Sequence, residues 1–202
     1  FFEDLDHKVG KGVIAVAAFD YAGRPGQAVT VLEEPWHLSY PFLIERDGEV
    51  FMIPESSANR EIVIYRASDF PLKWERHAVL VENVEAADAT IVEHGGLCYM
   101  FAVTREGFGG YSDTLAIWWA EDLFGPWHPH RQNPVLVNDR TARPAGNFIR
   151  MNGGLFRPVQ DCRRAYGADL GLMKVTRLDR EGFVQEPHWR ISAGGPEGPG
   201  KR

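Results

Sequence analysis

The chain has 202 residues and a formal net charge of −6, with 22 Lys and Arg against 28 Asp and Glu. This acidic balance argues against nucleic acid as a partner, because phosphate binding requires a basic face. No apolar run approaches the roughly 18 residues that a membrane-spanning helix needs. No basic segment followed by an apolar stretch opens the chain as a signal peptide would. We therefore expect a globular cytoplasmic protein without a membrane span.

The composition favours β-structure. The chain contains 21 Gly, 13 Pro and six Trp, and 12% of its residues are aromatic. Short aromatic strands separated by Gly and Pro turns are typical of all-β proteins, and helical periodicity is absent. The two cysteines, Cys98 and Cys162, stand in no metal-ligand spacing. We expect both to be buried thiols and predict no metal and no cofactor.

The predicted strands begin with 12–20 and 28–32, on either side of a Gly/Pro turn at 23–26. After them come three similar segments, each an apolar strand, a two-residue turn and a second apolar strand. The turns are Asp47-Gly48, Gly95-Gly96 and Gly153-Gly154, in segments 40–55, 88–103 and 146–161. Such residue pairs tolerate the positive φ of a tight hairpin turn.

Each hairpin continues into a third strand and a fourth, and in the first two copies a bend ending in Trp separates them. The third strands are 62–67, 115–120 and 170–176, and the fourth strands are 78–81, 134–137 and 184–186. Four-stranded units of about 40–50 residues are the blades of β-propellers. We predict one propeller domain over 1–190, and a tail or the start of a further blade at 191–202. Its parts are a partial blade, 1–38, and the blades 39–86, 87–142 and 143–190. The alternative is a β-sandwich, which the repeated Trp bend disfavours.

Several motifs resemble one family. They include His37-Leu-Ser-Tyr-Pro-Phe42, Asp88-Ala-Thr-Ile91, Gly125-Pro-Trp127, Ala142-Arg-Pro-Ala-Gly146 and Arg157-Pro158 followed by Gln160-Asp-Cys162. In this order they resemble the N-terminal domain of glucosamine inositolphosphorylceramide transferases and its bacterial relatives. The resemblance implies the five-bladed propeller of glycoside hydrolase families 43, 62, 32 and 68. Five blades need about 250–300 residues, so this chain is a fragment, closes with fewer blades, or is completed by a second chain. Open blade edges would favour a homo-oligomer.

Three carboxylates stand at ends of predicted strands in different units. They are Glu55, Asp88 and Asp161. Glycoside hydrolysis needs an acid and a base or nucleophile about 5–9.5 Å apart, and these three are the candidate catalytic residues. Glu55 follows an apolar stretch, and apolar surroundings favour the protonated form that a general acid needs. The alternatives are a solvated loop residue for Glu55, a turn cap for Asp88 and pairing with an arginine for Asp161.

Candidate substrate-binding residues surround these carboxylates in the repeat. They are His37, Tyr40, Arg105, Arg143, Arg157 and Gln160. A guanidinium group binds a carboxylate or phosphate bidentately; the alternative for Arg157 is a salt bridge to Glu55 or Asp161. Aromatic residues, among them Phe108 and Tyr111, are candidates for stacking on a sugar ring. The glycine-rich segment 106–113 that carries them is either a lid or a long turn.

The sequence thus predicts a carbohydrate-active propeller, resembling a glycoside hydrolase or associated with sugar transfer, with a glycan or sugar conjugate in its central channel. Two alternatives stay open. One is a non-catalytic glycan-binding module that serves a partner enzyme, as the family resemblance suggests. The other is an interaction scaffold whose open edges pair into a dimer.

Overall fold

The computed structural model describes residues 1–165, 168–192 and 195–197, and these are all-β. Among them, the only helical element is one 3₁₀ turn at Ser57–Asn59. The all-β prediction is therefore confirmed. The chain divides into two compact units, residues 1–86 and residues 87–202.

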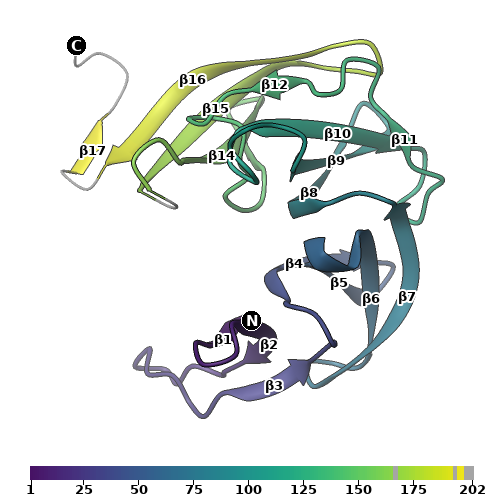
Figure 1. Ribbon diagram of the computed structural model, residues 1–202, viewed down its shortest axis with the longest axis vertical. Coiled ribbons are helices and arrows are strands. Elements are labelled where there is room, and N and C mark those ends of the chain that lie inside the picture. Colours follow the sequence, from purple (N-terminus) through teal and green to yellow (C-terminus); the bar gives the residue numbers. More distant parts are fainter. Residues whose placement is uncertain (166–167, 193–194, 198–202) are drawn as a thin grey trace. The chain divides into compact units, whose positions relative to one another are not determined.

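The first unit contains two antiparallel sheets (Figure 1). One has the order β1-β2-β3, and its strands are Phe2–Asp6, Lys11–Val16 and Val29–Leu32. The other has the order β4-β5-β6-β7, with strands Ser39–Arg46, Glu49–Glu55, Glu61–Asp69 and Lys73–Glu82. Strand β1 was not predicted, because four of its five residues are exposed and its sequence has no apolar alternation.

The second unit also contains two antiparallel sheets. In the first, β8 (Ala86–His94), β9 (Leu97–Thr104) and β10 (Thr114–Ala120) are neighbours. Strand β10 then pairs with two short strands, β11 (His128–Pro129) and β12 (Leu136–Val137). The predicted fourth strand at 134–137 is thus correct only for its last two residues. Strand β11 pairs with the other end of β10.

The second sheet of this unit has the order β13-β14-β15-β16-β17. Its strands are Ile149–Met151, Gly154–Asp161, Asp169–Leu178, Phe183–Ser192 and Gly195–Glu197. Strand β17 lies in the segment that the sequence predicted as a tail or the start of a new blade, and it pairs with β16. Residues 193, 194 and 198–202 of that segment lie outside the described residues.

Apolar side chains fill the space between the two sheets of the second unit, which lie side by side in Figure 1. Phe101 and Leu115 come from β9 and β10, and Leu155 and Val175 come from β14 and β15. Each of these side chains is less than 10% exposed. Burying them provides the main free-energy gain of folding here and fixes the faces of β8 and β14 on which polar residues stand.

The hairpin turns follow the prediction closely, with one correction. Asp47 and Gly48 have φ of 53° and 79°, and Gly95 and Gly96 have φ of 58° and 80°. In the third hairpin the turn is Asn152-Gly153 and not Gly153-Gly154, because Met151 pairs with Gly154 across the ladder. Asn-Gly is the pair that a two-residue type I′ turn prefers.

Positive φ also recurs where the chain enters each of these hairpins. Tyr40, Asp88 and Gly146 have φ of 43°, 59° and 118°. Two of these are not glycine, and such a conformation is uncommon for a bulky residue like Tyr40. In the first hairpin it coincides with a β-bulge between Ser39 and Phe42. The repeated entry bend, together with the turns, supports the internal repeat read from the sequence.

Gly96 provides a test of the turn geometry. A Cβ added there meets no atom within 4 Å, so only backbone strain opposes a side chain. We expect Gly96→Ala to lower the free energy of unfolding by about 1–2 kcal/mol, and Gly96→Asn to lower it less, because Asn tolerates left-handed φ. Urea unfolding measures both. Two equally destabilised variants, or an unaffected Gly96→Ala, would contradict the assigned turn.

Candidate functional site

Asp88 is the buried carboxylate at the centre of the polar site in the second unit. Its side chain is 2% exposed, and its Oδ2 lies 2.6 Å from Nε of Arg143. A buried carboxylate is stable only with a partner that compensates its lost hydration. Arg143 is itself only 12% exposed, so the pair is shielded from solvent on most sides and its geometry is fixed.

Gln160, from β14, completes this group. Its side-chain Nε2 donates to the carbonyl oxygen of Pro144 at 3.0 Å and lies 3.4 Å from Oδ2 of Asp88. Its backbone N–H donates to the carbonyl of Arg143 at 2.9 Å. Asp88, Arg143 and Gln160, called here the Asp88 cluster, are thus three predicted site residues that the structure brings together from well-separated parts of the sequence.

Asp161 follows Gln160 but points to the other face of β14, because successive side chains of a strand alternate. Arg163 and Arg190 each donate to its Oδ2 at 2.8 Å. The hydrogen bond from Arg163 holds the pKa of Asp161 below its usual value, against the opposing effect of burial. The alternative prediction, pairing with an arginine, is confirmed. A carboxylate held ionised in this way is poorly suited to act as a general acid.

Arg157 is fully buried, with 1% exposure. Its guanidinium donates to the carbonyls of Thr141 and Ala142 and to Oε1 of Gln185, and it lies over the ring of Phe101 at 5.9 Å from the centroid. These contacts fix the backbone immediately before Arg143. Arg157 therefore holds in place the segment that leads into Arg143, and it presents no surface to a ligand.

Glu55 and His37 form a second polar group, in the first unit. Ser39 Oγ donates to Oε2 of Glu55, and the N–H of Ser57 donates to Oε1 at 3.1 Å. Nδ1 of His37 accepts the N–H of Gly12 at 2.9 Å, so the neutral ring carries its proton on Nε2. That atom is 4.0 Å from Oε2 of Glu55. The apolar surroundings expected for Glu55 are wrong, because polar groups contact both carboxylate oxygens.

Sequence reasoning missed two members of this group. Glu3 Oε1 lies 3.5 Å from Nε2 of His37, and no motif marked that residue. Ser39 stands opposite Glu55 in the ladder only because the bulge at Tyr40 shifts the register there. Tyr40 itself is half-buried at the bulge, and Arg105 is exposed in the loop after β9.

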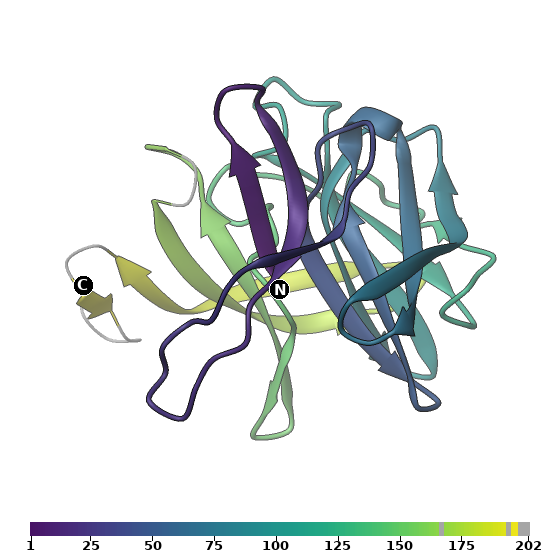
Figure 2. The ribbon, with the colours of Figure 1, turned by 90° about the horizontal axis from the view of Figure 1, so that it is seen from below.

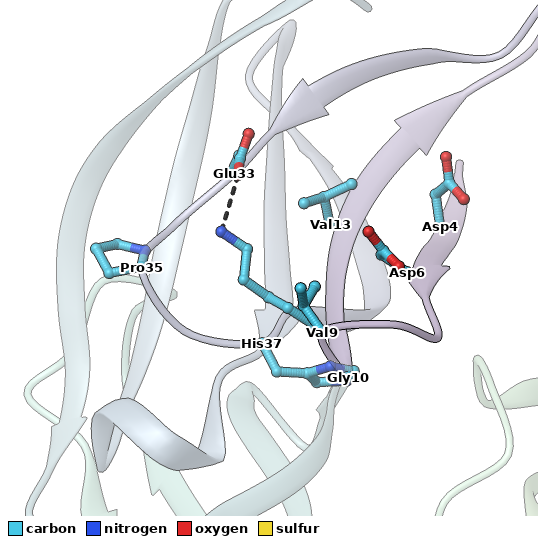
Figure 3. A pocket seen from close by; sticks show the side chains of 9 residues that line it. Asp4, Asp6, Val9, Gly10, Val13, Glu33, Pro35 and His37 are labelled. Carbon is cyan, nitrogen blue, oxygen red and sulfur yellow. Dashed lines mark hydrogen bonds and ion pairs between the residues drawn. The ribbon is translucent and has the colours of Figure 1, made fainter.

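An open hollow of about 720 Å³ lies beside His37 in the first unit (Figure 3). Charged and apolar residues share its walls, and Lys11 Nζ is paired with Oε1 of Glu33 at 2.8 Å. The lining residues are Asp4, Asp6, Val9, Gly10, Lys11, Val13, Glu33, Pro35 and His37. Within the described residues, no group of three or more His, Cys, Asp or Glu side chains is placed to hold a metal ion.

Comparison with known proteins identifies the family. The family model described as "Glucosamine inositolphosphorylceramide transferase 1, N-terminal" matches residues 1–190. The chain belongs to this family. It is 35% identical over 192 residues to glucosamine inositolphosphorylceramide transferase 1 of Oryza sativa subsp. japonica, covering 93% of this chain and 26% of that protein. The Arabidopsis thaliana protein of the same name is 33% identical over 187 residues, covering 91% and 24%. The chain therefore spans about a quarter of these relatives.

Two solved structures that are similar to this chain are glycoside hydrolases. A thermostable family-43 glycoside hydrolase matches with a TM-score of 0.63 and 15% identity, covering 99% of this chain and 73% of that chain. An α-L-arabinanase of Cellvibrio cellulosa, complexed with arabinohexaose, gives a TM-score of 0.62 and 14% identity, covering 87% and 69%. At these identities the likeness concerns the fold. Over the described residues, no helix has the length and hydrophobicity needed to cross a membrane.

The paired state of Asp161 predicts a pH dependence of stability. Because the folded pKa lies below the ordinary value of 3.8, the stabilisation is present above about pH 4 and is lost as the pH falls through the folded pKa. We expect Asp161→Asn to be less stable than the parent chain near pH 7, with the difference narrowing as the pH approaches about 3. Urea unfolding across this range, with Asp4→Asn as a surface control, measures it. A difference that stays constant with pH would contradict the pairing.

Proposed function

We propose that this chain is a carbohydrate-recognition domain whose Asp88 cluster binds a sugar of a glycan or sugar conjugate. The observation that carries the proposal is the Asp88–Arg143 pair, held at 2.6 Å beside Gln160. The family adds support, since its relatives are named glucosamine inositolphosphorylceramide transferases. So does the likeness of the fold to glycoside hydrolases, one of them in complex with arabinohexaose.

The cluster has the chemistry that sugar recognition requires. A carboxylate accepts hydrogen bonds, a guanidinium donates several in one plane, and an amide does both. Neighbouring sugar hydroxyls both donate and accept, so planar groups of this kind can engage two at once. Because the contacts within the cluster already hold its side chains, binding a sugar would lose little side-chain entropy.

The arrangement favours recognition over hydrolysis. Hydrolysis needs two carboxyl groups across one glycosidic bond. At the entry bends of the three hairpins the residues are Tyr40, Asp88 and Ala145-Gly146, so only one position carries a carboxylate. Asp88 is paired with Arg143, and Asp161 lies on the other face of β14 and is paired with Arg163. Arg143 and Gln160 are then the sugar-contacting residues, and Asp88 positions them.

Hydrolysis is the second candidate function, favoured by the match of 99% of this chain to a family-43 glycoside hydrolase. In that case Glu55, Asp88 and Asp161 are the proposed catalytic carboxylates. His37, Tyr40 and Arg105 would join Arg143 and Gln160 as substrate-binding residues. The buried Arg157 would not contact the substrate and would hold the segment before Arg143. We also propose the finer architecture, in which residues 1–190 form blades of a five-bladed propeller. A second copy would then pair with an open blade edge.

Replacing Arg143 tests the binding site. We expect Arg143→Gln to weaken binding of the best glycan on a microarray by about tenfold or more, because a charge-assisted hydrogen bond is lost. Isothermal titration calorimetry measures the affinity. Arg66→Gln, the same charge change at an exposed position on β6, is the control and should bind like the parent chain.

Two outcomes decide between the candidate functions. If the parent chain binds no glycan, or if Arg143→Gln binds as tightly as the parent chain, the recognition proposal is wrong. Turnover of aryl glycosides by the parent chain that disappears in Asp88→Asn would establish hydrolysis in its place.

A further inference from the structure

The loop between β9 and β10 carries a fully exposed aromatic side chain, Phe108. The loop comprises residues 105–113 and contains Gly107, Gly109 and Gly110. Single exposed apolar residues are common and by themselves indicate nothing. Phe108 differs because the loop that holds it has a defined structure and is attached to the proposed sugar-binding site.

Asp113 gives the loop its structure. Its Oδ2 accepts the N–H of Gly109 at 3.0 Å, and the N–H of Ser112 donates to the carbonyl of Gly109 at 3.2 Å. A Cβ at Gly109 would stand 2.5 Å from Oδ2 of Asp113, and one at Gly107 would stand 2.7 Å from Oδ1. The glycines therefore allow the backbone to close around the carboxylate. In this conformation the glycine-rich segment is held by its own contacts.

Arg143 connects the loop to the site. Its Nη1 donates to the carbonyl of Tyr111 at 2.9 Å, while its Nε pairs with Asp88. The side chain of Tyr111 packs on the apolar core of the second unit. The carbonyl of Asp113 accepts the N–H of Asn138 at 2.7 Å, in the segment that leads to Arg143. One guanidinium thus fixes both the buried carboxylate and the loop that presents Phe108.

We propose that Phe108 is a ligand-contacting residue that packs on the apolar C–H face of the sugar bound by the Asp88 cluster. This inference rests on the proposed function. A sugar ring has hydroxyl groups at its edge and C–H groups on its face, so a complete site needs a polar group and an apolar plane. Arg143 and Gln160, positioned by Asp88, supply the first. Phe108 supplies the second, and burying an aromatic ring against the sugar stabilises the complex.

The experiment compares two equally exposed aromatic residues on different loops. Tyr21 is also fully exposed, in the loop between β2 and β3 that extends away from its strands in Figure 2. The probes are glucosamine, galactose and arabinohexaose, measured by calorimetry. We expect Phe108→Ala to weaken the tightest of the three by about tenfold and Tyr21→Ala to leave it unchanged. Because Phe108 is exposed, its removal should not affect folding, which circular dichroism checks.

A spectroscopic measurement separates contact from an indirect effect. With 4-fluorophenylalanine at position 108, saturation with the bound probe should shift the ¹⁹F resonance, whereas 3-fluorotyrosine at position 21 should not respond. If the parent chain binds none of the three sugars, the proposed function and this inference both fail. If Arg143→Gln weakens binding but Phe108→Ala does not, or the ¹⁹F resonance stays unshifted, the proposed function stands and the role of Phe108 is wrong.

Discussion

The buried ion pair between Asp88 and Arg143 is the constraint on which the polar site of the second unit depends. A carboxylate that is 2% exposed requires a counter-charge, so the segment that carries Arg143 must lie at the start of β8. Asp88 also occupies left-handed φ at that point, which an Asp tolerates better than a branched residue. Backbone and charge together fix where the carboxylate stands. The carbonyl of Tyr111, in the loop after β9, accepts a hydrogen bond from the guanidinium of Arg143. Gln160, near the end of β14, lies beside the carboxylate of Asp88.

Two arginines close in sequence have different roles because they are buried to different degrees. Arg157 is 1% exposed and donates to carbonyls of the segment before Arg143. Arg143 is 12% exposed and stands at the edge of the polar group. A guanidinium with its donors satisfied by main-chain oxygens stabilises a fold, whereas one that keeps a face toward solvent can also bind a ligand. In this way the buried Arg157 holds the more exposed Arg143 in place.

The sequence allowed most of the strand order to be predicted, because the turns have strong local chemistry. Asp47-Gly48 and Gly95-Gly96 form the predicted turns, and the third turn lies one residue earlier because Asn152-Gly153 suits a type I′ turn. Strand β1 has no apolar alternation and gave no signal. Asp88, Arg143 and Gln160 were all candidates from their positions in the repeat, although nothing in the sequence indicated that they contact one another.

The remaining site predictions depended on features that the sequence does not display. Asp161 lies beside Gln160 in the sequence, yet alternation along β14 directs it toward Arg163 and Arg190 on the other face. The polar surroundings of Glu55 arise from a bulge at Tyr40, which brings Ser39 opposite it. A bulge changes the register by one residue, and a turn-based register alone would have placed Tyr40 there.

A double-mutant cycle on Asp88 and Arg143 tests the central claim most directly. The free energy of unfolding would be measured for the parent chain, Asp88→Asn, Arg143→Gln and the double variant. If the buried pair organises the site, the two changes are strongly non-additive, with a coupling energy of about 2 kcal/mol or more. Additive changes, with a coupling energy within about 0.5 kcal/mol of zero, would show that the two groups do not depend on each other and would contradict this account.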